Sequence, residues 1–531
     1  MSGDGSGAIG RPNFNQSSGR AGFSLFFLIL ICGLGYTAYS VYGDIQNSGA
    51  FEATFLPYAL LGVALLIALG FEFVNGFHDT ANAVATVIYT HSLPPHAAVV
   101  WSGLCNFCGV LVSSGAVAFG IISLLPVELI LQVGSSAGFA MVFALLVAAI
   151  IWNLGTWWLG LPASSSHTMI GSIIGVGVAN ALMHGRDGTS GVDWGQAAKV
   201  GYSLLLSPLV GFAFAALLLV IMRAVIKNAE LYQEPNAANP PPWWIRGILI
   251  LTCSGVSFAH GSNDGQKGMG LIMLILVGTM PISYALNRAM PVNDTVRFAA
   301  VAQVAQSELK QLAPTAAPAD VHQTLSDYIR TKELKPEVIP ALAEMAGNIG
   351  KQVREYNPLG TVPTGAVSNV RNDMYLASEA VRLLDKDTKS GLSPENHKTL
   401  IAFKHQLDEA TKFIPLWVKI AVAIALGLGT MIGWKRIVVT VGEKIGKTHL
   451  TYAQGASAEL VAMATIAAAD GFGLPVSTTH VLASGVAGTM AANRSGLQLS
   501  TIRNLAMAWV LTLPAAMLLS GSLYWLLTKV F

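Results

Sequence analysis

Long apolar runs separated by short polar segments dominate this chain. A helix that crosses a bilayer needs roughly 20 predominantly apolar residues, so the length of a run limits how often it can cross. The pattern predicts about eleven crossings and an all-α polytopic membrane protein. The predicted spans are 22–43, 55–90, 98–124, 138–159, 162–183, 197–222, 246–288, 413–434, 453–472, 475–492 and 500–528.

One long segment, residues 287–412, departs from this apolar pattern. It is rich in Lys, Glu, Gln and Asp, and it contains helix-like runs such as "DVHQTLSDYIRTKEL". Its charges are typical of solvated helix faces, and it contains no constellation of catalytic residues. We therefore expect a soluble, mainly helical insert between two spans.

Composition agrees with a membrane protein. The chain is 53% hydrophobic and 11% charged, whereas a soluble domain carries about a quarter charged residues. The net charge of +2 gives no reason to expect nucleic acid as a partner. The partner that the composition predicts is the lipid bilayer.

The positions of the basic residues predict the orientation. Arg11 and Arg20 precede the first span, whereas the following loop contains no Lys or Arg. Cytoplasmic loops carry an excess of basic residues, so we expect the N-terminus to be cytoplasmic. A later loop with Arg223, Lys227 and Arg246 is expected on the same side. The polar insert then lies on the periplasmic side.

Two polar motifs each occur twice in apolar surroundings. "FVNGFHDTANAVAT" (73–86) corresponds to "FAHGSNDGQKGMGL" (258–271), and "GLPASSSHTMIG" (160–171) corresponds to "GLPVSTTHVLAS" (473–484). Each half holds about five crossings, an odd number, so we expect two inverted-topology repeats with interrupted or re-entrant helices. Whether the GLP segments cross fully or re-enter is left open by the pattern.

These features divide the chain into six parts. They are a tail with an extra transmembrane helix (1–54), the first repeat (55–222), a cytoplasmic linker (223–245), the start of the second repeat (246–286), the soluble insert (287–412) and the remainder of the second repeat (413–531).

The GLP motifs predict helices that begin inside the membrane. Proline suits the first turn of a helix, and a neighbouring Ser or Thr caps its free N–H groups. A helix start carries unpaired N–H donors and a positive dipole end, which favour an anion. The alternative is that the hydroxyls only cap a kinked helix; two copies, each paired with an Asp motif, favour a binding site. The hydroxyl donors are Ser164, Ser165, Ser166, Ser477, Thr478 and Thr479.

The Asp motifs place charge inside apolar spans. Asp79 and Asp264 are accompanied by Asn82, Asn263 and Lys267 and by several glycines. This mixture predicts unwound backbone, which is tolerated at membrane depth only where it lines a cavity. Two carboxylates repel an anion unless a bound cation, a proton or the lysine supplies positive charge. The motifs therefore favour cation- or proton-coupled anion transport.

Four further ionisable residues lie within predicted spans. His167 and His480 follow the hydroxyl runs, and each could donate to an anion, carry a proton, ligate a metal or only bond a neighbouring carbonyl. Glu72 and Glu459 are additional intramembrane acids. A proton or cation site and a structural hydrogen bond are both open for each acid.

Together, "NGFHDTANAVAT", "GLPASSSHT", "AHGSNDGQKG" and "GLPVSTTH" resemble the Pit family of inorganic phosphate transporters, most closely its bacterial low-affinity branch. The four motifs occur in order across both halves, which makes the resemblance specific. It covers nearly all of the chain outside residues 1–54 and the insert.

The resemblance implies a secondary active transporter that imports inorganic phosphate across the bacterial inner membrane. The implied substrate in the bacterial branch is phosphate complexed with a divalent metal, and protons drive the symport. Sodium coupling is the alternative within the family. The sodium-coupled branch often has a glutamate where this chain has Asn106, whereas Glu459 fits that branch, and the single loss favours protons.

The resemblance also implies roles for single residues. Phosphate binding falls to the hydroxyls of both GLP motifs, with Asn82 and Asn263. Asp79 and Asp264 complete the central site and hold the metal of a metal–phosphate substrate. Arsenate is expected to compete, a homodimer is expected by family analogy alone, and no bound cofactor is expected. The central site or coupling path is expected to include Asp79, Asp264, Glu459, His167, His480 and Lys267.

Three other functions fit the sequence less well. An intramembrane protease would need one nucleophile and one base, whereas every element here is duplicated. An ATP-driven pump would need a phosphate-binding loop, and "GSNDGQKG" has the wrong spacing and no following Ser or Thr. A sulfate carrier is disfavoured because sulfate cannot donate a hydrogen bond to the two aspartates, while protonated phosphate can.

Overall fold

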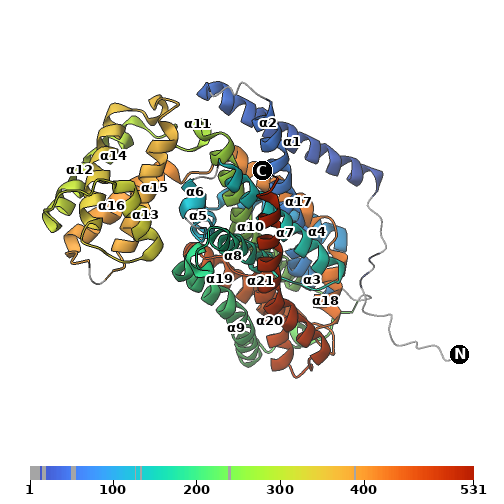
Figure 1. The fold of residues 1–531 in the computed structure, drawn as a ribbon. Helices are drawn as coiled ribbons and strands as arrows, with labels where there is room; N and C mark the ends of the chain where they lie inside the picture. Colours follow the sequence, from blue (N-terminus) through green and yellow to red (C-terminus); the bar gives the residue numbers. More distant parts are fainter. Residues whose placement is uncertain are drawn as a thin grey trace.

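The computed structural model describes residues 12, 14, 19–49, 55–79, 81–125, 127–131, 134–236, 241–387 and 390–530. These residues are predominantly helical (Figure 1). The helices are α1 (Arg20–Ser48), α2 (Leu56–Asp79), α3 (Ala81–Tyr89), α4 (Pro95–Val112), α5 (Ala116–Ile122), α6 (Val127–Leu131), α7 (Ser136–Trp158), α8 (Ser165–Met183), α9 (Trp194–Val225), α10 (Trp243–Thr279), α11 (Pro281–Tyr284), α12 (Val292–Leu312), α13 (Val321–Thr331), α14 (Val338–Glu355), α15 (Val367–Leu384), α16 (Pro394–Thr411), α17 (Leu416–Thr430), α18 (Lys435–Glu443), α19 (Tyr452–Gly471), α20 (Thr478–Ala492) and α21 (Leu499–Leu527). Short 3-10 turns lie at Gly188–Gly191, Ala229–Tyr232 and Leu359–Thr361.

Fewer helices than expected are both long and apolar enough to cross a membrane. Within the described ranges there are seven, or eight if the bent pair α16 and α17 counts as one span, compared with about eleven predicted crossings. The seven are α1, α2 with α3, α4, α7, α8, α9 and α21.

The other four predicted spans are short or polar. Helices α17 and α20 have 15 residues each, less than the roughly 20 that a bilayer requires. Helices α10 and α19 are longer, but they carry charged and amide side chains in the middle of their apolar sequence. Three of the four, α10, α19 and α20, carry predicted site residues of the second half.

The prediction of unwound backbone is wrong at the second Asp motif, which lies within helix α10. The helix runs without a break from Trp243 to Thr279, through Asp264. Its glycines serve close packing instead: a side chain at Gly261 would come within 2.2 Å of the Asn106 carbonyl oxygen, and one at Gly268 would meet Glu72. At the first Asp motif, α2 ends at Asp79, and the next residue lies outside the described ranges.

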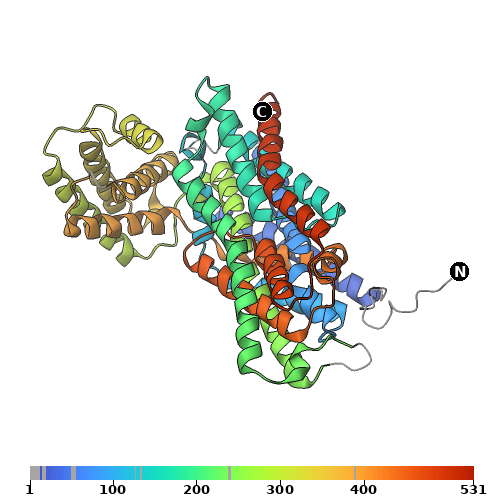
Figure 2. The same cartoon turned by 90° about the horizontal axis from the view of Figure 1, so that it is seen from below.

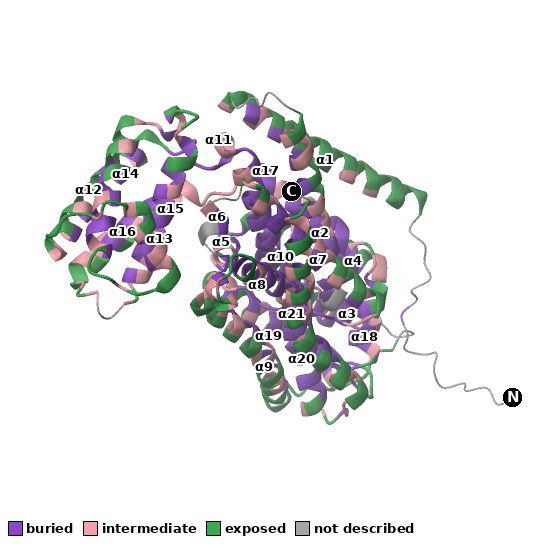
Figure 3. Cartoon of the chain, viewed as in Figure 1, coloured by how far each residue is buried: buried purple, intermediate pink, exposed green. Residues whose placement is uncertain are grey.

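Helices α12 to α16 pack around their own apolar side chains; we call them the α12–α16 bundle. Phe298, Leu342, Met374 and Phe403 are all buried there. Figure 1 shows the bundle beside the other helices, and Figure 2 shows α9 running from its vicinity to the far end of the molecule. Figure 3 shows buried positions concentrated along α8 and α10, whereas α1 is largely exposed.

Ionic contacts attach the bundle to the start of α9. Asp193 caps α9 by accepting a hydrogen bond from the Gln196 N–H (3.1 Å). Its carboxylate also pairs with Lys332 (2.5 Å) and Arg382 (3.1 Å) of the bundle. Burial of Asp193 opposes ionisation, but Lys332, the capping N–H and Arg382 together lower its pKa below 3.8.

We expect Asp193→Ala to loosen the bundle by about 1–2 kcal/mol, because it removes a helix cap and two partly exposed ion pairs. Asp193→Asn keeps a capping oxygen and should cost about 1 kcal/mol or less. The contribution of a lowered pKa is present above the unfolded value and is lost as pH falls through the folded value. In the unmodified chain, the protection of the Lys332 and Arg382 amides from hydrogen exchange should therefore decrease only in acid. In Asp193→Ala, their protection should already be reduced at neutral pH, and unchanged protection would contradict this.

Candidate functional site

Helices α8 and α20 begin in the same way, as the GLP motifs predict. Ser164 and Ser477 are the respective N-caps, and their hydroxyls accept hydrogen bonds from the N–H groups of His167 (3.2 Å) and His480 (3.1 Å). Pro162 and Pro475 lie in the extended segments just before these caps. The predicted caps of both helices are thus confirmed.

The two helix starts lie against each other although they are about three hundred residues apart in sequence. Ser166 Oγ donates to the carbonyl of Val476 (2.6 Å). Asn263 of α10 holds the second extended segment: its amide donates to Leu474 O (3.1 Å) and its carbonyl accepts from Val476 N (3.4 Å). The predicted residues of both halves therefore meet in one place.

Asp79, the last residue of α2, receives donors from both helix starts. Ser165 Oγ donates to Asp79 Oδ2 (2.5 Å), and Thr479 Oγ1 donates to Asp79 Oδ1 (2.9 Å). His78 Nδ1 lies 2.8 Å from Oδ1 of the same carboxylate. All four side chains are buried. One carboxylate thus connects α2, α8 and α20.

Asp264 and Lys267 form the second ionic element. Lys267 Nζ lies 2.7 Å from Asp264 Oδ2 and donates to Ser166 Oγ at 2.5 Å. Ser165 Oγ is 3.3 Å from the same Asp264 oxygen, so it joins the two aspartates. Two carboxylates and one ammonium leave one net negative charge when the histidines are neutral. Lys267 thus supplies part of the positive charge that an anion at this site requires.

The two histidines of the GLP motifs also meet. The rings of His167 and His480 have centroids 4.8 Å apart, and Trp509 of α21 lies against His480 at 4.3 Å. Neither His167 Nδ1 nor His480 Nε2 has a hydrogen-bond partner among the described residues. The same holds, within those ranges, for Thr478 Oγ1 and Asp264 Oδ1. Buried polar atoms are nearly always bonded, so such a group of exceptions requires an explanation.

Glu459 lies apart from this cluster. Its two carboxylate oxygens accept hydrogen bonds from Thr86 of α3 and Thr252 of α10. Thr252 precedes Asp264 by twelve residues on one continuous helix, roughly 18 Å along its axis. The structure therefore does not place this acid with the other predicted site residues. Asn82, another predicted site residue, has a side chain outside the described part of the structure.

A group of three side chains offers ligands for a cation. Single ligand atoms of Asp79, His260 and Asp264 all lie within 4.8 Å of one another, and all three residues are buried. Carboxylate oxygens with one imidazole nitrogen suit several divalent metals. His260 also bonds Asn106 through Nδ1 (3.0 Å).

Three residues of the site, His78, His260 and Trp509, have no role predicted from the sequence. His260 and Asp264 are four residues apart, so they lie on one face of a helix; the expectation of unwound backbone hid this spacing. His78 is adjacent to Asp79, but consecutive residues of a helix do not face each other, so the sequence gives no reason to bring the two side chains together. Nothing in the sequence indicates that Trp509 packs on a histidine.

Comparison with known proteins identifies the family of the chain. The profile of the phosphate transporter family matches residues 75–520. The chain is 43% identical over 486 residues to the low-affinity inorganic phosphate transporter PitA of Escherichia coli (strain K12), covering 88% of this chain and 96% of that protein. It is 41% identical over 485 residues to PitB of the same strain, with the same coverage of each chain.

A solved structure titled "The sodium-dependent phosphate transporter" has 20% identity and a TM-score of 0.48, with 89% of this chain and all of that chain covered. The family match and the PitA and PitB relatives concern transporters and not enzymes. Because these matches cover most of the chain, it belongs to the Pit branch of the phosphate transporter family.

Proposed function

We propose that this chain imports inorganic phosphate, as a complex with a divalent metal, by proton symport. The binding site is the cluster between the starts of α8 and α20. The observation that carries the proposal is the group of buried polar atoms there without partners among the described residues: Thr478 Oγ1, Asp264 Oδ1, His167 Nδ1 and His480 Nε2. An oxyanion with its own hydroxyl can donate to the carboxylate oxygen and accept from the other groups.

Two helix starts support an anion at this position. Helices α8 and α20 both begin at the cluster, and the N-terminal end of each helix carries partial positive charge. The hydroxyls of Ser165, Ser166 and Thr479 donate to protein groups, so a bound anion replaces the bonds that they make to Asp79 and to the Val476 carbonyl. The site is thus preassembled but closed.

The charge of the cluster supports a cation as part of the cargo. Asp79, Asp264 and Lys267 together are negative by one charge, and a free phosphate dianion would be repelled. A divalent metal held by Asp79, His260 and Asp264 reverses this repulsion and can bind the phosphate oxygens directly. The metal travels here as substrate.

Proton coupling rests on groups that exchange a proton within the membrane. We assign Glu459 to this path because its buried carboxyl is bonded only by the hydroxyls of Thr86 and Thr252 within the described residues. Helix α10 connects Glu459 to Asp264, so a change at one end can reach the other. His167 and His480 act at the substrate.

The layout also supports alternating access by inverted repeats. Helices α8 and α20 start together and α8 ends beside α21, while α20 packs on α9. We propose that residues 55–222 and 246–531 without the α12–α16 bundle form the two repeats. The protein lies in the bacterial inner membrane, with the N-terminus and the 223–245 linker in the cytoplasm and the bundle in the periplasm.

Uptake of labelled phosphate into proteoliposomes tests this function. Proton, sodium and Mg²⁺ gradients are imposed one at a time, with arsenate and sulfate as competitors. We expect uptake to require an inward proton gradient and Mg²⁺, to be inhibited by arsenate and to be insensitive to sulfate. Uptake that follows sodium without protons would establish the sodium-coupled alternative. No phosphate uptake under any gradient would refute the proposal.

We expect Glu459→Gln to separate transport from coupling. Glutamine keeps the size of the side chain and one acceptor oxygen for the threonine hydroxyls but cannot release a proton. Proton-driven phosphate accumulation should fall at least about tenfold, while exchange of internal for external phosphate persists. Asp294→Asn, at an exposed position of α12, is the matched control. Normal accumulation in Glu459→Gln removes this residue from the path.

A further inference from the structure

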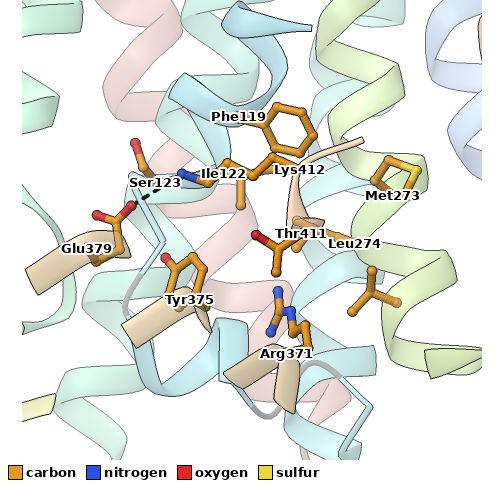
Figure 4. Close-up of a pocket in the computed structure, with 11 residues that line it drawn as sticks. Phe119, Ile122, Ser123, Met273, Leu274, Arg371, Tyr375, Glu379, Thr411 and Lys412 are labelled. Carbon is orange, nitrogen blue, oxygen red and sulfur yellow. Dashed lines mark ion pairs between the residues drawn. The ribbon is translucent and has the colours of Figure 1, made fainter. Parts of the chain in front are cut away.

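A cavity with polar groups on one wall lies where the α12–α16 bundle meets the other helices. Phe119, Ser123 and Met273 line it from α5, the turn after α5, and α10, and the bundle contributes the opposite wall (Figure 4). The cavity has a volume of ≈ 40 Å³. Since about 10–15 Å³ on this measure admits one water, it has room for roughly three waters or one small oxyanion.

The bundle wall contains a buried arginine without an acidic partner. Arg371 is 8% exposed, and no carboxylate of the described residues lies within ion-pair distance of its guanidinium. Its Nη1 donates to the carbonyl of Ile130 and to Asn372 Oδ1, both at 3.1 Å, and the guanidinium lies over the Tyr375 ring. Burial lowers the pKa of Arg371, but a guanidinium stays charged. A buried charge without a counter-ion is costly and favours an anion.

Other polar groups complete the wall. Lys412 reaches the cavity and shares its charge between Asp408 (2.8 Å) and Glu379 (3.7 Å). The Tyr375 hydroxyl makes no hydrogen bond to any described residue. Glu379, which is held by Arg382 at 2.6 Å, also faces the cavity. In Figure 4, the Arg371 guanidinium points toward Thr411, and the Tyr375 hydroxyl lies on the side of Glu379.

We propose that this cavity is a second phosphate site, in which Arg371, Lys412 and Tyr375 donate to the anion and Glu379 accepts from its hydroxyl. The chemistry selects a protonated oxyanion: two cations bind its charge, and the acidic neighbour rejects an anion such as sulfate that has no proton to donate. Within the proposed function, on which this role rests, the site collects phosphate on the bundle side of the membrane.

Helix α10 links this cavity to the central cluster. Met273 and Leu274 line the cavity nine and ten residues after Asp264, which is roughly 14 Å along the helix axis. The helix is continuous between them. Phosphate held at Arg371 is therefore within about two to three helical turns of the proposed transport site.

Binding of inorganic phosphate to the full-length protein, purified in detergent, tests the site. The Asp79→Asn/Asp264→Asn variant removes the proposed central site, so its remaining binding reports the cavity alone. We expect one phosphate per chain in this background, with no displacement by an equal concentration of sulfate. Adding Arg371→Gln should weaken this binding at least tenfold, whereas Arg297→Gln, at an exposed bundle position, should leave it unchanged.

Three results would overturn the proposal. One is the absence of phosphate binding in the background variant. This result counts if Arg371→Lys, which keeps the charge, unfolds at the same temperature as the parent chain, because the bundle then does not need a bound anion at Arg371 to fold. The second is equal binding after Arg371→Gln. The third is binding of phosphatidylglycerol from nanodiscs in place of inorganic phosphate, which would make the cavity a lipid headgroup site. Failure of transport with this binding intact would affect only the proposed function.

Discussion

Phosphate uptake should fall at least a hundredfold in Asp79→Asn and in Asp264→Asn, about 2.7 kcal/mol or more of transition-state stabilisation. Asp79 is the acceptor on which Ser165 and Thr479 converge, from α8 and α20. Asp264 shares Ser165 and holds Lys267. Asparagine keeps the shape of each side chain but removes the charge that holds a cation. Initial rates of labelled phosphate uptake in proteoliposomes measure the effect.

The two variants should still insert into the membrane, because their side chains remain buried and hydrogen-bonded. Size-exclusion profiles close to that of the unmodified chain provide the control for both variants. An unchanged thermal unfolding temperature is expected only for Asp79→Asn, because Asp264→Asn leaves the buried Lys267 without its ion-pair partner. Asp294→Asn, which neutralises an exposed aspartate of the α12–α16 bundle, should transport normally. Uptake close to normal in both site variants would exclude this cluster as the phosphate site.

The largest loss of stability is expected for Lys267→Met. Lys267 is 1% exposed, and its ammonium pairs with the fully buried Asp264 at 2.7 Å. Removal of one partner of a buried ion pair leaves an uncompensated charge and typically costs about 3–5 kcal/mol. The thermal unfolding temperature of the purified protein should fall, and transport should be lost.

The double variant Lys267→Met/Asp264→Asn distinguishes charge from packing. It removes both charges, so most of the lost stability should return, since replacing both partners of a buried pair is often nearly neutral. Phosphate uptake should stay absent because the cation ligand is gone. A double variant as unstable as Lys267→Met alone would mean that the lysine side chain is needed for its volume and not for its charge.

Much of the site follows from local sequence. The helix starts at Ser164 and Ser477 are fixed by a proline, a capping hydroxyl and an apolar continuation, all of which act within one turn. The duplication of the motifs indicated that the two starts belong together, and their order matched the family. The all-helical fold likewise follows from apolar runs too long for strands.

Other expectations failed because they depend on what a segment packs against. The glycines around Asp264 read as unwound backbone, yet a neighbouring helix uses them for close approach and α10 stays intact. Glu459 is a carboxylate in an apolar setting, as the site aspartates are, but twelve residues of helix separate its partner Thr252 from Asp264. Residue type and apolar surroundings do not specify how far apart two buried carboxylates lie.

The sequence by itself determined the helical membrane class, the two pairs of motifs and the family. Each of these depends on residue type and on spacing along the chain. Only the tertiary structure decided that His260 lies beside Asp79, that Trp509 covers His480, and that Arg371 faces a cavity without a carboxylate partner among the described residues. These contacts join segments far apart in sequence, and helix periodicity specifies which face a side chain occupies but not which helix packs against that face.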